Sequence, residues 1–127
     1  MKDNFSITNE TKGKLPSLPF ENIKNKVLGK KYELSLIFVT EKKIQALNKT
    51  YRNINKPTDI LSFPIAKNFG EVFICQKYSV KKAKEFEREY NNFIAFLFIH
   101  GCVHLKGYEH GNKMEKEEVK YRKYFKI

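Results

Sequence analysis

"FIAFLFIHGCVHLKGYEHG", residues 93–111, combines a long apolar run with a cluster of histidines. Residues 93–99 are apolar on every side of a helix, and a helix without a polar face is buried in the middle of its domain. The same stretch contains all three histidines of the chain, His100, His104 and His110. We therefore expect a buried helix that carries a cluster of histidines at its end.

Strand patterns precede this stretch. Short runs that are apolar or alternate between polar and apolar residues predict strands at 4–8, 31–39, 60–63 and 70–75. Pro64 is expected to close the third strand, because proline removes a hydrogen-bond donor from the backbone.

Helix patterns lie between and after the strands. Apolar residues three and four positions apart predict a helix that ends at Gly29 and a second one that Thr40 caps. The segment 79–106 is helical in pattern, with a break at which Asn91 or Asn92 caps the buried helix. The chain is therefore expected to be mixed α and β.

The composition predicts one domain and a polyanionic partner. A length of 127 residues suits a single domain over 1–127, and no run of about 18 apolar residues is present to cross a membrane. The first residues lack the pattern of a secretory signal, so a cytoplasmic protein is expected. The net charge of +11 favours nucleic acid over a membrane surface as the partner.

The spacing of the histidines predicts a metal site. His100 and His104 are four residues apart, which places both imidazoles on one face of a helix. Gly107 allows the chain to reverse, so that His110 can return toward them. Three imidazoles and no thiolate favour one zinc ion with a fourth position left for water, as in catalytic zinc sites. Zinc lowers the pKa of such a water to about 7.

The same spacing, His-x3-His-x2-Gly-x2-His, occurs in the metzincin proteases. Those enzymes carry a glutamate directly after the first histidine as general base, and here that position is Gly101. Amide hydrolysis by that mechanism is therefore disfavoured.

Two longer motifs resemble a known family. "HGCVHLKGYEH" and "LNKTYRNINKPTDILSFP" are similar to the two signatures of the bacterial YbeY endoribonucleases, which are ribosomal RNA maturation factors, and "GEVFIC" is similar to a strand of that family. The three matches occur in the family's order and span residues 47–110. Glu109 and Glu71 each replace an aspartate of the family pattern and keep its charge.

The resemblance implies a fold and an activity. The fold would be α+β, with a small mixed β-sheet packed by helices and a buried helix that carries a three-histidine zinc site. The activity would be zinc-dependent cleavage of single-stranded RNA in ribosomal RNA maturation, at the 3′ end of 16S rRNA, and in ribosome quality control. The implied partners are ribosomal RNA and the ribosome or a ribosomal protein, with no DNA and no membrane expected. By position, His100, His104 and His110 would hold one Zn²⁺, and Arg52 and His100 would be the catalytic residues.

Other charged residues near these motifs have two interpretations each. Asp59 either orients a ligating histidine or braces a turn, and Glu109 is either a proton shuttle or a solvated side chain. The run "EKEEVKYRK" at 115–123 is expected to form a solvated helix face.

Two other functions compete with RNA cleavage. A zinc peptidase would need Glu109 to replace the missing helix glutamate as the base. A protein that binds ribosomal RNA or the ribosome without catalysis would use zinc as a structural ion. Structural zinc is normally enclosed by four protein ligands, which three histidines do not provide.

Overall fold

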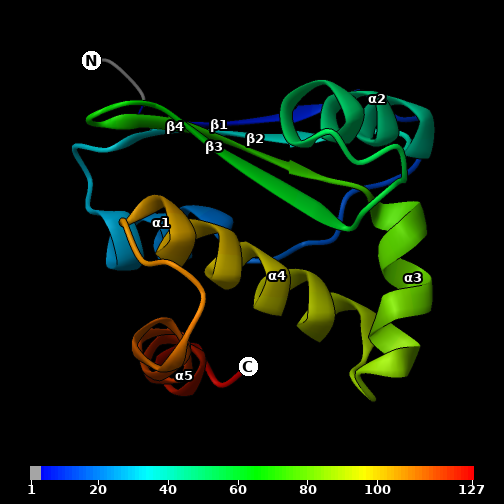
Figure 1. The fold of residues 1–127 in the computed structure, drawn as a ribbon. Helices are drawn as coiled ribbons and strands as arrows, with labels where there is room; N and C mark the ends of the chain where they lie inside the picture. Colours follow the sequence, from blue (N-terminus) through cyan, green and yellow to red (C-terminus); the bar gives the residue numbers. More distant parts are fainter. Residues whose placement is uncertain (1–3) are drawn as a thin grey trace.

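A computed structural model describes residues 4–127, and the first three residues of the expected domain lie outside it. Figure 1 shows a single sheet with helices along one face and at one end. The sheet has the order β1-β2-β4-β3, in which β1, β2 and β4 are parallel and β3 is antiparallel to β4. The expected α+β class with a small mixed sheet is thereby confirmed. The strands are β1 (Phe5–Asn9), β2 (Glu33–Phe38), β3 (Ile60–Ala66) and β4 (Phe69–Ile74).

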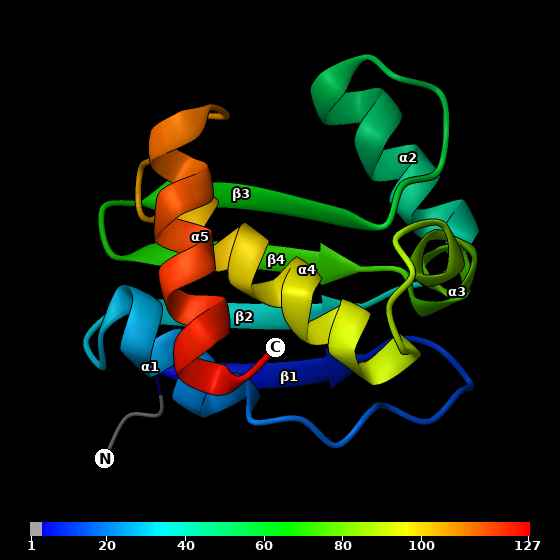
Figure 2. The ribbon, with the colours of Figure 1, turned by 90° about the horizontal axis from the view of Figure 1, so that it is seen from below.

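The five helices of the described residues occupy two places. Figures 1 and 2 show α1, α4 and α5 on one face of the sheet, with α4 between the sheet and α5, while α2 and α3 lie toward one end of the strands. None of the helices over residues 4–127 has the length and apolar character to span a membrane. The helices are α1 (Phe20–Leu28), α2 (Glu41–Arg52), α3 (Gln76–Glu85), α4 (Tyr90–Leu105) and α5 (Asn112–Phe125).

Helix α4 is the central element of the core. Its apolar residues pack against α1 on one side and the sheet on the other, and Phe98 is fully buried in ring contact with Phe20, at 5.1 Å between centroids. The prediction of a buried helix over residues 93–99 is therefore correct.

Strand β3 is longer than its sequence indicates. It continues through Pro64 to Ala66, and Pro64 lies opposite Gly70 just before a register shift. The prediction that Pro64 closes the strand is wrong because β3 is an edge strand, where a missing backbone donor leaves no neighbouring strand unpaired.

The two helices after β4 begin earlier than expected. Helix α3 starts at Gln76 rather than at Ser79. The cap of α4 is Glu89, whose carboxylate accepts hydrogen bonds from the backbone of Asn91 and Asn92 at 3.2 Å each. The two asparagines therefore lie in the first turn of α4 and do not cap it.

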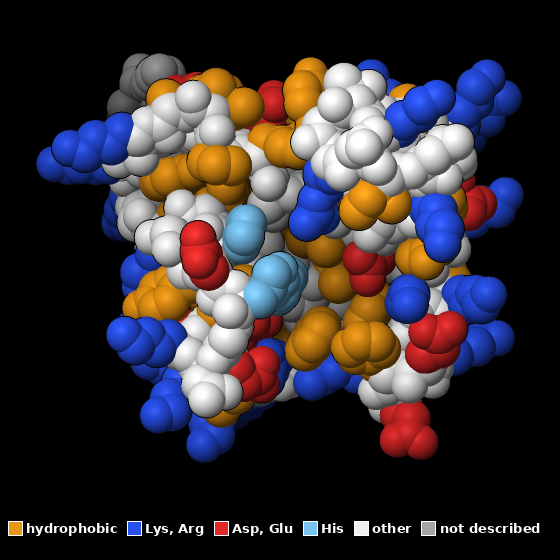
Figure 3. Space-filling view, viewed as in Figure 1, with side chains coloured by type: hydrophobic (Ala, Val, Ile, Leu, Met, Phe, Trp, Pro, Cys, Tyr) orange, Lys and Arg blue, Asp and Glu red, His pale blue; other side chains and the backbone are white. Residues whose placement is uncertain are grey.

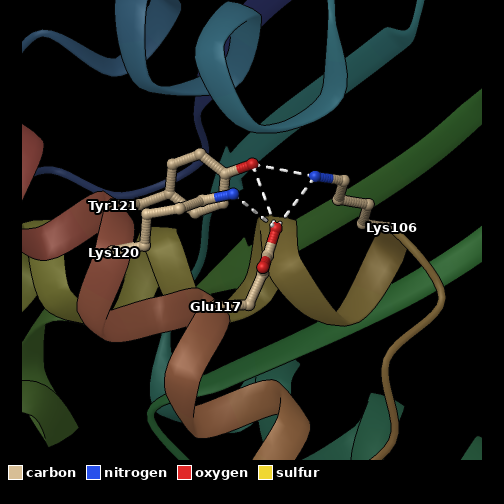
Figure 4. Close-up of polar contacts among 4 residues, drawn as sticks. All are labelled: Lys106, Glu117, Lys120 and Tyr121. Carbon is tan, nitrogen blue, oxygen red and sulfur yellow. Dashed lines mark hydrogen bonds and ion pairs between the residues drawn. The ribbon is translucent and has the colours of Figure 1, made fainter.

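Helix α5 is fastened to the end of α4 by a polar network (Figure 4). Lys106 donates to the carboxylate of Glu117 at 3.1 Å and to the hydroxyl of Tyr121 at 2.8 Å, and Lys120 donates to the same carboxylate at 3.2 Å. Tyr121 is buried, and so is Glu118 on the same helix. One side of α5 therefore packs against α4, and the solvated face expected over 115–123 is the opposite side of the helix.

Candidate active site

The structure brings the three histidines together. His100 and His104 lie on one face of α4, and the ring centroid of His110 lies 5.5 Å from the first and 5.7 Å from the second. The return of the chain depends on Gly107, whose φ of 113° is strained for any other residue. The reversal expected from the sequence therefore occurs at the expected glycine.

A carboxylate from α5 fixes the orientation of His100. Glu118 is 4% exposed, and its Oε1 accepts a hydrogen bond from Nδ1 of His100 at 3.0 Å. An ionised carboxylate can only accept, so the proton of a neutral His100 is on Nδ1 and the lone pair is on Nε2. Histidines that bind metals usually carry such a carboxylate on their other nitrogen.

Glu118 is the site residue that the sequence analysis missed. A signal was present, because Met114, Glu118 and Tyr121 are spaced four and three residues apart and are the buried residues of α5. For Asp59 two roles were expected, to orient a histidine or to brace a turn. Its side chain accepts from Thr58 at 3.3 Å and its backbone carbonyl accepts from Cys75 at 2.9 Å, so Asp59 braces the turn before β3.

Arg52 shares a cavity with the histidines. It is the last residue of α2, and its neighbour Tyr51 packs on Phe63 of β3 with 5.3 Å between ring centroids. This contact holds the end of α2 beside the cavity of about 250 Å³ that Arg52 lines together with His100, His104, His110 and Ser62. A guanidinium group and three imidazoles therefore face the same space.

The surroundings of His104 keep its imidazole neutral. Burial lowers the pKa of His104 below its usual value, and the charges of His110, His100 and Arg52 lower it further. The Tyr108 backbone raises this pKa, but by less than burial lowers it. The Nδ1 atom of His104 is buried, and no described group has full hydrogen-bond geometry with that atom, although the Tyr108 backbone is near enough to the imidazole to act on its pKa. A neutral ring has a lone pair, which is the form that binds a metal.

The donor set fits a divalent cation. Metal–nitrogen bonds of about 2.0–2.1 Å to a tetrahedral zinc place the centres of neighbouring imidazoles about 5 Å apart, close to the spacing found here. Over residues 4–127, however, no group of three or more His, Cys, Asp or Glu side chains has the geometry needed to hold a metal ion. The zinc site therefore stays a prediction.

Gly101 lies where α4 packs closely against β3. A Cβ at this position would lie 2.8 Å from Oγ of Ser62 and 2.9 Å from Cδ1 of Ile60. A side chain at this position requires the side chains of Ser62 and Ile60 to shift, so the glutamate of the metzincin pattern is disfavoured here. Glu109, the alternative base, is exposed to solvent.

Comparison with known proteins places the chain in a family. The model of the family "Endoribonuclease YbeY" matches residues 3–125. The endoribonuclease YbeY of Aliarcobacter butzleri is 40% identical over 94% of this chain and 91% of its own, and that of Ureaplasma parvum is 38% identical over 92% and 84%. The solution structure of TM1509 from Thermotoga maritima is 30% identical, with a TM-score of 0.63 over 92% of this chain and 85% of that one. The chain belongs to the endoribonuclease YbeY family, as its two signatures indicated.

Proposed function

We propose that this protein is a metal-dependent endoribonuclease that hydrolyses phosphodiester bonds of single-stranded ribosomal RNA. The observation that carries the proposal is the shared cavity in which Arg52 and three imidazoles face one another. The membership of the family supports it, because the relatives are named endoribonucleases.

Each residue has a stated part in this activity. His100, His104 and His110 would hold the cation, with Zn²⁺ as the ion that best suits three imidazoles. A divalent cation bound there would activate water and neutralise charge on a phosphate oxygen. Glu118 holds His100 with Nε2 turned away from the hydrogen bond, and Arg52 binds the phosphate of the substrate through its planar guanidinium group.

The charge of the molecule suits an RNA substrate. The surface in Figure 3 carries Lys and Arg side chains around a hollow that the histidines border. With a net charge of +11, the chain gains affinity for RNA through release of counterions from the phosphates. We expect it to act in the cytoplasm during maturation of the 3′ end of 16S rRNA and ribosome quality control, with the ribosome or a ribosomal protein as partner.

Neither alternative function has comparable support. A zinc peptidase lacks a base, since the position after His100 is Gly101, which lies against Ser62 and Ile60, and Glu109 lies in solvent. A binding protein with a structural ion does not account for an arginine beside three imidazoles on a cavity wall.

The test is a cleavage assay on a precursor ribosomal RNA fragment with zinc, with the cut ends mapped. We expect the wild type to cut, a chelator to stop it, His104→Ala to be inactive and Arg52→Ala to be about 100-fold slower, as for loss of a group that stabilises transition-state charge. Lys49→Ala is the matched control, because it removes a positive charge from the same last turn of α2.

Two outcomes would contradict the proposal. Cleavage by His104→Ala at the wild-type rate would show a contaminating nuclease. RNA binding by the wild type without any cleavage would favour the non-catalytic alternative.

A further inference from the structure

A second cavity lies on the other side of the histidines. Its volume is about 320 Å³, and it shares Ile60, His100 and His110 with the cavity that Arg52 lines, so the two form one continuous depression. Figure 3 shows this depression as a hollow with a hydrophobic floor beside the histidines. The apolar part of the floor consists of Phe86, Phe93, Phe96, Leu97 and Met114.

Phe86 is an exposed ring on a buried aromatic support. It is 52% exposed at the end of α3, while Phe93 beneath it is fully buried. The centroid of Phe86 lies 5.3 Å from that of Phe93 and 5.9 Å from that of Phe96. Phe86 therefore packs at an angle on Phe93 and edge-to-face on Phe96, and these contacts hold its ring while part of the ring stays open to the cavity. A fixed, half-exposed phenylalanine beside an active site offers a stacking surface.

The two cavities differ in charge. Arg52 lines the first, whereas Asp59, Glu115 and Glu118 line the second, and Arg122 pairs with the two glutamates at 3.2 and 3.6 Å. The carboxylate of Asp59 repels a phosphate whereas Arg52 attracts one, so the RNA backbone is favoured on the side of Arg52. A nucleobase is neutral, can stack on an aromatic ring and can donate its N–H groups to a carboxylate.

We propose that the cavity over Phe86 is a nucleobase subsite, which takes one unpaired base from the nucleotide adjacent to the scissile phosphate. Phe86 stacks on the base, and Asp59, which has one carboxylate oxygen on Thr58, accepts a hydrogen bond from the base edge. This proposal rests on the proposed function, because it uses the phosphate position beside Arg52. It also gives a physical reason for single-strand selectivity, since a base in a duplex cannot enter the cavity.

The test combines protein variants with RNA that lacks one base. Short single-stranded oligonucleotides carry an abasic nucleotide at each position in turn, and binding by fluorescence anisotropy and cleavage are both measured for wild type, Phe86→Ala and Phe86→Tyr. Val80→Ala is the control, since Val80 is also exposed on α3 but lines a different cavity. Melting temperatures show whether each variant is folded.

We expect the effect of removing the Phe86 ring to depend on the presence of one particular RNA base. With intact RNA, Phe86→Ala weakens binding and kcat/KM about 5- to 10-fold, Phe86→Tyr retains both, and Val80→Ala has no effect. One abasic position next to the cut weakens the wild type by a similar factor, and there Phe86→Ala causes no further loss. A purely structural effect of Phe86→Ala would be equal at every abasic position.

The outcomes separate the two proposals. If the wild type binds RNA but does not cleave it, the proposed function fails. Binding to the abasic oligonucleotides, measured by fluorescence anisotropy, still shows whether the nucleobase subsite exists. If Phe86→Ala weakens all the oligonucleotides equally, or none of them, the nucleobase subsite is refuted whether or not RNA is cut.

Discussion

Helices α4 and α5 both contribute to the candidate site, but their buried residues are not equally easy to recognise from the sequence. Most residues of α4 are buried, and the apolar run and the two histidines are visible in its sequence. Helix α5 is largely charged, yet it buries Met114, Glu118 and Tyr121 against α4. An apolar run in a sequence indicates burial directly, whereas a buried carboxylate is recognised with certainty only when the residue that it contacts in the fold is known.

The largest expected effect is a loss of stability in α4. Phe98→Ala removes a fully buried ring and should lower the free energy of unfolding by about 3–5 kcal/mol, through lost burial and the cavity left behind. Urea denaturation measures this, with Lys116→Ala on the exposed side of α5 as the control, expected to change stability by less than about 0.5 kcal/mol. Equal effects of the two substitutions would remove the contrast between the helices.

The next effect concerns the function of α5. Glu118→Gln keeps the shape of the side chain but removes the charge that His100 contacts, and should weaken zinc binding about 10- to 100-fold. Competition with a chromophoric chelator measures the affinity. Glu115→Gln, one turn earlier and exposed, is the control and should bind zinc as the wild type does. If Glu118→Gln bound zinc as tightly as the wild type does, α5 would not contribute to the metal site.

A smaller effect is expected where α4 meets β3. Gly101→Ala places a methyl group against the side chains of Ser62 and Ile60, which must shift to accept it. We expect a loss of about 1–3 kcal/mol in the free energy of unfolding, as for overpacked cores. Thermal and urea unfolding provide the measurement, and a stabilising effect would show that the close approach is unnecessary.

The smallest effect belongs to the network that holds α5 to α4 (Figure 4). The hydrogen bond from Lys106 is the main cause that lowers the pKa of Glu117 below its usual 4.5. Glu117→Gln should cost no more than about 1 kcal/mol at pH 7, because the side chain is near the surface. A lowered folded pKa means that this contribution is present above about pH 4.5 and is lost as the pH falls through the folded pKa. Stability curves of wild type and variant should therefore converge in acid; a constant difference would contradict this account.

The sequence predicted the parts of the molecule that depend on local pattern. The buried helix, the mixed α and β order and the return of His110 after Gly107 all follow from residue spacing. The continuation of β3 past Pro64 depends on its place at the edge of the sheet, which topology decides. The roles of Glu118 and Phe86 depend on how α5 and α3 pack against α4, and the residue spacing alone does not specify which side chains meet there.

Zinc binding is the most direct test of the central claim that the three histidines are gathered to hold one catalytic metal. Native mass spectrometry during a zinc titration would count the ions per chain in wild type and in His104→Ala. The account predicts one tightly bound zinc per wild-type chain and none in the variant at the same concentration. No bound zinc in the wild type, or one bound zinc in both proteins, would contradict it.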